Sequence, residues 1–208
     1  MIFRDRVDAG RKLAGALASF RGQNAVVYAL PRGGVVLGVE VAKSLGALLD
    51  LIVVRKIGHP DNPEYAVAAV ADDGHVAANR AETDMIDRNW FDIARRTQMA
   101  EACRRRDHYL AGRTPVSAEG KIAIIVDDGL ATGLTMSLAV REARHRNPSK
   151  IVIAVPVAPS ETIAELRQIA DEIVVLHLPE HGFRAIGAFY LDFPQLTDAE
   201  VVELMRGY

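Results

Sequence analysis

The chain has 208 residues, of which 50% are hydrophobic and 25% are charged, and its formal net charge is −2. This balance predicts one globular domain with a full core and gives no electrostatic case for nucleic-acid or membrane binding. Its single cysteine, Cys103, excludes an intrachain disulfide. No apolar run approaches the roughly 20 residues of a membrane-spanning helix, and the first residues do not resemble a signal peptide, so we expect a cytoplasmic protein.

The first predicted elements include a strand, a turn and a helix in succession. Residues 4–20 have apolar side chains at helical spacing and predict a packing helix. Residues 25–30 predict a buried strand, and the turn Pro31-Arg32-Gly33-Gly34 separates it from a helix at 35–45. Adjacent glycines allow close backbone approach and arginine pairs well with phosphate, so this turn is a candidate anion site. Gly-Gly turns are frequent, and the turn alone indicates little.

The next apolar run, 48–57, predicts another buried strand, with Arg55 and Lys56 near its end. At the carboxyl edge of a parallel sheet, basic side chains would balance the charge of an anionic ligand. Such residues also occur as solvated charges at strand ends. Arg55 fits both interpretations equally, whereas we favour the ligand-binding interpretation for Lys56.

Residues 58–114 interrupt the alternation of strands and helices. The stretch 65–78 predicts a hairpin around Asp72-Asp73-Gly74, and 82–111 predicts one long helix or two shorter ones. The apolar face of this helical stretch comprises Ile86, Trp90, Ile93 and Ala94.

Two groups of polar residues in this segment receive no functional role. The basic run Arg104-Arg105-Arg106 lacks interleaved aromatic residues, which favours a solvated helix side over a nucleic-acid patch. The histidines at 59, 75 and 108 are not spaced as metal ligands, so we assign them no metal.

The most informative stretch begins with an apolar strand, 122–126, that ends at Asp127 and Asp128. Small residues at 129–133 lead into a helix that begins near Leu134. Ligands bind at this edge of an open parallel sheet, and small residues let backbone N–H groups approach a phosphate. The two acids can hold ribose hydroxyls directly or through Mg²⁺. An ordinary turn capped by aspartate is the alternative, but a cap requires only one carboxylate.

The rest of the chain predicts a helix at 134–145, a strand at 151–157, a helix at 160–170 and a strand at 172–178. The alternation predicts an α/β fold: a doubly wound, mainly parallel sheet with helices on both faces. The tail, 179–194, is rich in glycine and aromatic residues, which are either core side chains or a surface on which a base stacks. Residues 196–205 predict a final helix.

The stretch IAIIVDDGLATGLT resembles the ribose-phosphate binding motif of type I phosphoribosyltransferases, in which an apolar strand, two acids, a short spacer and Thr-Gly follow one another. The resemblance implies a single phosphoribosyltransferase-like domain over 1–208. An insertion at about 58–114 would carry a mobile loop at 59–64, and a hood at about 179–208 would recognise a base. The implied donor is 5-phosphoribosyl 1-diphosphate with Mg²⁺, and the implied acceptor is a nitrogenous base or another nitrogen nucleophile. A homodimer stays open.

The same resemblance implies the site residues. Asp127 and Asp128 would hold the ribose hydroxyls and Mg²⁺. The 5′-phosphate would contact Ala131, Thr132, Gly133, Leu134 and Thr135. The pyrophosphate would contact Arg32, Gly33 and Gly34, and Lys56 would add positive charge. The two acids, Arg32 and Lys56 are therefore the candidate catalytic residues.

The motif departs from purine-specific members of the family, which carry an acid in the spacer where this chain has Leu130-Ala131. This departure puts hypoxanthine or guanine as the acceptor in doubt. A non-catalytic module that senses the donor or a nucleotide is a second hypothesis, because sensing requires the same phosphate loop. A Rossmann-type dinucleotide enzyme and a phosphate-loop nucleotidase are disfavoured, since GxGxxG after the first strand and GxxxxGK[ST] are absent.

Overall fold

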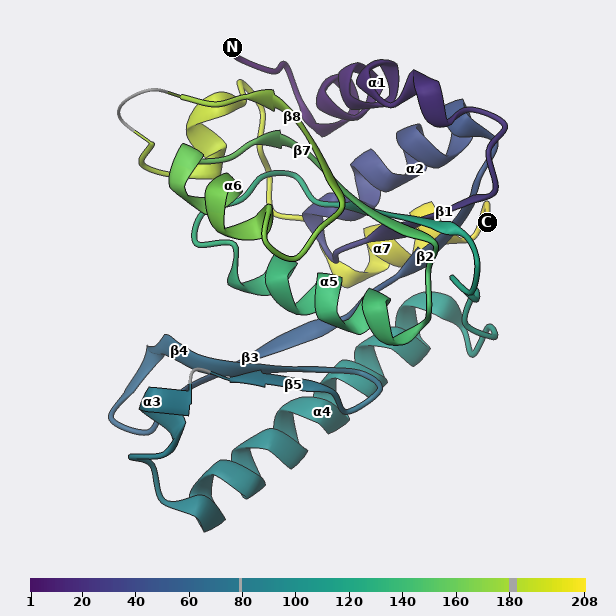
Figure 1. The fold of residues 1–208 in the computed structure, drawn as a ribbon. Coiled ribbons are helices and arrows are strands. Elements are labelled where there is room, and N and C mark those ends of the chain that lie inside the picture. The colour runs from purple at the N-terminus through teal and green to yellow at the C-terminus, as the bar shows by residue number, and fades with distance from the viewer. Residues whose placement is uncertain (79, 180–182) are drawn as a thin grey trace.

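The computed structural model describes residues 1–78, 80–179 and 183–208. Its centre is a five-stranded parallel sheet in the order β2-β1-β6-β7-β8 (Figure 1). The strands are β1 (Ala25–Ala29), β2 (Leu48–Leu51), β6 (Ile122–Val126), β7 (Lys150–Val157) and β8 (Glu172–His177). The three inner strands are almost entirely buried, as expected for a parallel sheet covered on both faces.

Helices cover both faces of this sheet (Figure 1). They are α1 (Arg6–Ala16) and α2 (Gly33–Leu45) on one face, and α5 (Leu134–His145) and α6 (Ser160–Leu166) on the other. Alternate strand residues point to opposite faces: Val27 and Ile124 pack with α1 and α2, whereas Tyr28 and Ile125 pack with α5 and α6. The predicted doubly wound fold is therefore confirmed. Within the described residues, no helix is long and apolar enough to cross a membrane.

The single strand predicted at 48–57 is wrong. The chain leaves the parallel sheet after β2, and Ile52 and Val53 lead into a separate antiparallel sheet in the order β3-β4-β5. This sheet contains β3 (Val54–His59), β4 (Asn62–Ala71) and β5 (Val76–Ala78). Because residues 51–54 are all apolar, nothing in the sequence marks the change of pairing partner there. Arg55 and Lys56 consequently extend from the small sheet.

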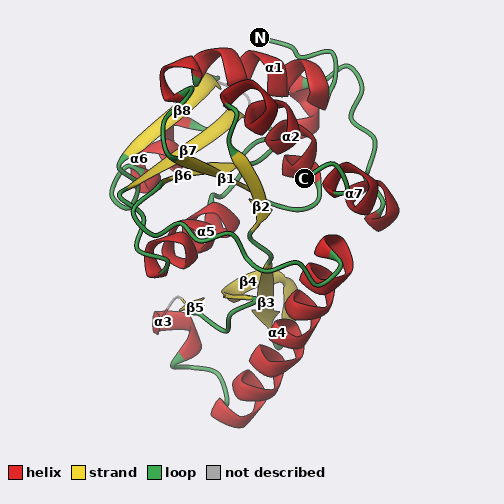
Figure 2. Cartoon of the chain, turned by 90° about the vertical axis from the view of Figure 1, so that its right-hand side faces the viewer, coloured by secondary structure: helices red, strands yellow, loops and turns green. Residues whose placement is uncertain are grey.

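A long helix lies across the small sheet (Figure 2). The helices of the inserted segment are α3 (Arg80–Thr83) and α4 (Arg88–Leu110). The predicted hairpin is confirmed, since β4 and β5 pair around a turn in which Gly74 has a φ of 90°. Trp90 and Ala94 pack against the sheet, but Ile93 is 63% exposed. The apolar face of α4 is therefore narrower than its periodicity predicts.

The segment 59–64, for which the resemblance implied a mobile loop, belongs to the β3–β4 hairpin. His59 pairs with Asn62, and Pro60 and Asp61 form the turn between them. Backbone pairing thus continues to His59 and Asn62, next to the tip of the hairpin. The turn-forming residues of this segment mark its two-residue turn and do not interrupt the strands.

The C-terminal tail packs against the N-terminus. It contains η2 (Ile186–Phe189) and α7 (Asp198–Met205). Phe3 and Tyr190 form a parallel β-bridge, their ring centroids are 5.4 Å apart, and both side chains are buried. The ring of Phe193 lies 4.6 Å from that of Tyr190. These two tail aromatics are therefore packing residues, in line with the core interpretation.

Asp5 caps α1, because its side chain accepts a hydrogen bond from the Asp8 backbone N–H at 2.7 Å. This bond lowers the pKa of Asp5, so the cap contributes at neutral pH and is lost as the pH falls through the lowered pKa. Asp5→Ala should reduce the free energy of unfolding by about 1 kcal/mol at pH 7 and by less at pH 3, measured by urea denaturation. Asp107→Ala, at an exposed position of α4, is the control, and an equal loss there would contradict the cap.

Candidate active site

A loop of small residues at the carboxyl end of β6 encloses part of a cavity of about 140 Å³. The loop runs from Gly129 to Gly133, and Gly133 caps α5 with a φ of 70°. The other lining residues are Lys56, Asp127, Leu134, Thr135, Met136 and Ile186. Because the first N–H groups of a helix have no partner within the helix, the cavity adjoins a natural anion site. All the residues predicted to bind the 5′-phosphate line this cavity.

Close packing fixes the shape of the loop. The Thr162 hydroxyl donates to the Ala131 carbonyl at 2.7 Å. A Cβ on Gly133 would lie 2.6 Å from Thr162 Cγ2, and one on Gly129 would lie 2.6 Å from Ile186 Cγ2. Glycine is therefore required at both ends of the loop by steric contact, and at Gly133 also by its left-handed backbone.

The two acids of the motif point in different directions. Asp127 lines the cavity, and its Oδ1 accepts a hydrogen bond from the Asp128 backbone N–H at 2.8 Å. Asp128 is buried, and its Oδ2 lies 2.8 Å from Nε of Arg6 in a salt bridge. The Tyr190 hydroxyl donates to the Asp128 carbonyl at 2.6 Å. Asp127 is thus the acid open to a ligand, and Asp128 is held by the protein.

Arg6 is the site residue that the sequence did not indicate. It is buried in the first turn of α1, donates to the Pro194 carbonyl at 2.7 Å, and lies 3.7 Å above the ring of Phe193. The helical pattern of 4–20 accounts for its place but not for its partner, which is 122 positions further along the chain.

Burial makes the charge on both carboxylates unfavourable. It raises the pKa of Asp127 well above the usual value, and the neighbouring charge of Asp128 raises it further. Burial also raises the pKa of Asp128, while the Arg6 guanidinium opposes that rise. A cation near Asp127 would offset the same penalty on the cavity side.

The Pro31–Gly34 turn lies directly against the two acids, and its Pro31–Arg32 peptide bond is cis. A Cβ on Gly33 would lie 1.9 Å from Asp128 Oδ2, and one on Gly34 would lie 2.7 Å from the Val126 carbonyl oxygen. Both glycines are therefore needed for the turn to approach the end of β6.

The three predicted basic residues occupy different surroundings. Lys56 reaches the cavity from the small sheet. Arg32 lies outside the cavity lining, and its Nη1 is 3.5 Å from Asp198 Oδ1 at the start of α7. Arg55 donates to the Gln98 side chain on α4 at 3.0 Å. Arg55, which fitted both the ligand-binding and the solvated interpretation, thus contacts the inserted helix α4.

Residues 5–181 match the family model for the phosphoribosyl transferase domain. The chain belongs to the phosphoribosyl transferase family. The resemblance seen in its acidic motif is therefore confirmed. The crystal structure of TT1426 from Thermus thermophilus is similar to this phosphoribosyl transferase chain with a TM-score of 0.85 and 39% identity, over 99% of this chain and 98% of that one.

Curated relatives of this phosphoribosyl transferase chain are longer. Two Mycobacterium tuberculosis proteins, from strains CDC 1551 and H37Rv, carry the provisional name phosphoribosyl transferase and are each 43% identical to it over 206 residues. The match covers 98% of this chain but only 46% of each relative. The chain therefore spans about half the length of these relatives.

Gly33→Ala tests the contact between the turn and Asp128. The new methyl group has to displace Asp128 and Arg6, so the free energy of unfolding should fall by about 1–3 kcal/mol, measured by chemical denaturation. Gly15→Ala on α1 is the matched control, because a Cβ there meets no atom of the described structure within 4 Å. It should be neutral or stabilise the chain by about 0.5–1 kcal/mol. Tolerance of both changes would contradict the close approach.

Arg6→Met tests the buried salt bridge. It leaves Asp128 buried without its partner, so the free energy of unfolding should fall by about 3–5 kcal/mol. In an Asp128→Asn background the same change should cost clearly less, because no charge is stranded. Arg4→Met, beside it but 68% exposed at its side chain, should have little effect. Equal costs of Arg6→Met in the two backgrounds would contradict the pairing.

Proposed function

We propose that this chain transfers a 5-phosphoribosyl group from 5-phosphoribosyl 1-diphosphate to a nitrogen nucleophile and releases pyrophosphate, with Mg²⁺ bound beside the donor. Membership of the phosphoribosyl transferase family supports the group transferred. The observation that carries the proposal is one cavity in which a small-residue loop at the start of α5 faces the Asp127 carboxylate. The small-residue loop suits a phosphate, and the Asp127 carboxylate suits a ribose diol or a hard cation.

The donor is held mainly by the loop. Its 5′-phosphate binds along Ala131–Thr135, where backbone N–H groups and the hydroxyls of Thr132 and Thr135 donate hydrogen bonds. The ribose hydroxyls donate to Asp127. Asp128 supports this arrangement through its backbone N–H, which already fixes one oxygen of Asp127.

The acidic residues also fit the chemistry of Mg²⁺. Carboxylate oxygens are the ligands that this ion prefers, and it commonly takes one or two of them together with substrate oxygens. Asp127 would be the direct ligand and Asp128 its neighbour, since Asp128 Oδ2 is already paired with Arg6. Bound Mg²⁺ would neutralise charge on the leaving pyrophosphate.

The proposed contacts to the pyrophosphate come from Arg32, Gly33, Gly34 and Lys56. Gly34 N–H already donates to the Leu30 carbonyl at 3.1 Å, so the contacts fall to Gly33 N–H and the two side chains. The ion pair of Arg32 with Asp198 is about one-third exposed on each side and 3.5 Å long. Such a pair contributes little stability, so Arg32 can turn to the ligand at small cost.

Transfer requires positioning more than proton chemistry. The electron pair of the acceptor nitrogen forms a bond to ribose C1 while the C1–oxygen bond breaks, and that bonding pair leaves with the pyrophosphate. Positive charge that develops on the ribose is stabilised by the Asp127 carboxylate beside it. The loop contributes by holding the donor in line for attack.

The acceptor side of the cavity includes an apolar residue of the tail, Ile186. The spacer Leu130-Ala131 offers no carboxylate to a purine nitrogen. Phe183 and Phe189 stack with centroids 5.6 Å apart, Phe189 also packs against the core, and neither ring lines the cavity.

Donor binding is tested by thermal unfolding with and without 5-phosphoribosyl 1-diphosphate and Mg²⁺. The pair should raise the midpoint, because a ligand of the folded state stabilises it. Asp127→Asn keeps the acceptor for Asp128 N–H but removes the charge, and should weaken donor affinity by about tenfold or more. Asp107→Asn on the outer side of α4 is the control. The donor assignment would be contradicted if the donor and Mg²⁺ did not raise the midpoint of the unmodified chain. It would also be contradicted if they raised the midpoints of Asp127→Asn and Asp107→Asn equally.

Transfer itself is tested by pyrophosphate release across a panel of purines, pyrimidines and amines. The expected result is release with at least one acceptor, which depends on Mg²⁺ and falls in Asp127→Asn in parallel with donor affinity. Donor binding without release for every acceptor would contradict transfer and favour the sensing alternative.

A further inference from the structure

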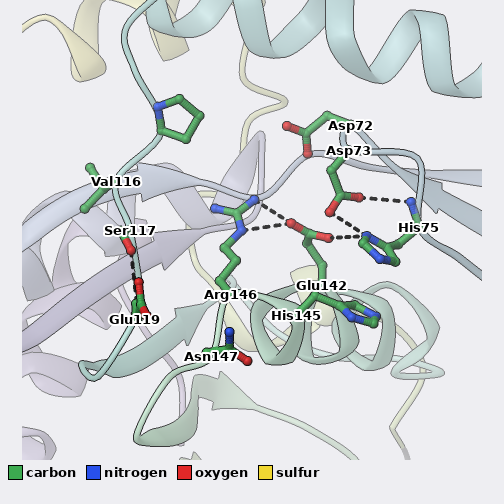
Figure 3. A pocket seen from close by; sticks show the side chains of 11 residues that line it. Asp72, Asp73, His75, Val116, Ser117, Glu119, Glu142, His145, Arg146 and Asn147 are labelled. Carbon is green, nitrogen blue, oxygen red and sulfur yellow. Dashed lines mark hydrogen bonds and ion pairs between the residues drawn. The ribbon is translucent and has the colours of Figure 1, made fainter.

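A cavity of about 510 Å³ lies at the opposite end of α5 from the loop 129–133. Figure 3 shows that side chains from the β4–β5 turn and from the last turns of α5 converge there. Asp73 and His75 come from the turn, and Glu142 and His145 come from the helix. Neither the loop nor the proposed transfer reaction uses any of these residues.

Three side chains in this cavity present ligand atoms to one another. His75 Nδ1 lies 2.6 Å from Asp73 Oδ2 and 3.4 Å from Glu142 Oε2 (Figure 3). One atom from each of Asp73, His75 and Glu142 lies within 4.8 Å of the other two. Tetrahedral coordination with bonds of 2.0–2.1 Å separates ligand atoms by about 3.3 Å. The His75–Glu142 distance already fits, and the Asp73–His75 contact has to open by less than about 1 Å.

Glu142 provides an independent indication of a missing partner. Its side chain is 1% exposed, and Arg146 donates to Oε1 from Nε and Nη2 at 2.8 and 2.6 Å. Its other oxygen, Oε2, is buried and accepts no hydrogen bond from the described residues, and its contact with His75 Nδ1 at 3.4 Å is an ion pair only if that imidazole is protonated. Buried carboxylate oxygens without a donor or a cation are costly and therefore rare.

The excess of negative charge around the cavity also favours a bound cation. Four carboxylates line the cavity, those of Asp72, Asp73, Glu119 and Glu142, against one guanidinium group, that of Arg146. Asp72 Oδ1 is a second buried oxygen that lacks a hydrogen bond within the described residues. A dication would offset part of this negative charge.

We propose that Asp73, His75 and Glu142 bind one divalent transition-metal ion, with Zn²⁺ as the representative ion. One imidazole with two carboxylates suits Zn²⁺ better than Mg²⁺ or Ca²⁺, which prefer oxygen ligands alone. Glu142 forms the floor of the site, while Asp73 and His75 form its exposed rim. A water molecule completes the coordination from the open side.

His145 is a positioning residue for this site. Its ring stacks on that of His75 with centroids 3.7 Å apart and an angle of 13° between the planes. The stack holds the His75 ring so that Nδ1 faces Glu142.

The bound ion would join the inserted hairpin to α5. Asp73 and His75 lie between β4 and β5, in the same small sheet that carries Lys56, whereas Glu142 lies on the helix that begins at the phosphate loop. The ion would therefore fix Lys56 relative to the loop, and its role would be structural.

The alternative to a bound metal ion is a proton shared by hydrogen bonds among Asp73, His75 and Glu142. Burial raises the pKa of Glu142 to about 7, so at neutral pH a proton competes with any ion. Binding should therefore be measured above this value, at about pH 8, where the carboxylate is ionised.

Isothermal titration of the chelator-treated chain with ZnCl₂ at about pH 8 tests the proposal, together with thermal unfolding under the same conditions. We expect one saturable site per chain and a raised unfolding midpoint. Asp73→Asn and His75→Gln change exposed side chains and should each weaken Zn²⁺ binding by at least about tenfold. Glu119→Gln removes a negative charge from the same cavity but no proposed ligand, and should bind like the unmodified chain.

Three results would overturn the proposal: no saturable Zn²⁺ binding, unchanged affinity in both Asp73→Asn and His75→Gln, or an equal loss in Glu119→Gln. Glu142→Gln should abolish binding if it folds, and the exposed variants decide the question if it does not. Asp127→Asn should leave Zn²⁺ affinity unchanged. The metal site and the proposed donor site can thus fail independently.

Discussion

The burial of Asp128 against Arg6 is the constraint on which the site depends. Four segments that are distant in the sequence meet at this pair: α1 through Arg6, the Pro31–Gly34 turn, the end of β6, and the tail through Tyr190. A buried carboxylate is costly without its partner, so the pair ties the position of α1 to the end of the sheet. The absence of a side chain at Gly33 follows from the same constraint, since a Cβ there would occupy the space of the Asp128 carboxylate.

This arrangement gives the two adjacent acids different tasks. Asp128 anchors the edge of the sheet to α1 and the tail, whereas Asp127 lines the cavity beside the loop 129–133. The anchoring acid also fixes the other one, because its backbone N–H donates to Asp127 Oδ1. In the proposed function, one carboxylate of the motif faces the ligand, and the backbone of the second acid keeps the first in place.

Those features that reside in one contiguous stretch were predictable from sequence. The strand, the small-residue loop and α5 follow one another between Ile122 and His145, so their order alone indicated an anion-binding edge. Features that depend on distant partners were not. The change of sheet within 48–57 depends on β4, and the role of Arg6 depends on Asp128. The approach of His75 to Asp73 and Glu142 could not be predicted either, because Glu142 comes from a helix far along the chain.

The central claim is that the loop between β6 and α5 holds the phosphoribosyl donor. Amide nitrogen–proton NMR spectra of the chain, titrated with 5-phosphoribosyl 1-diphosphate and Mg²⁺, test this claim most directly. The account predicts that the largest shifts fall on the backbone N–H groups of 129–135, with smaller ones at Gly33 and Lys56. Saturable shifts centred elsewhere, or no shifts at saturating donor, would contradict it.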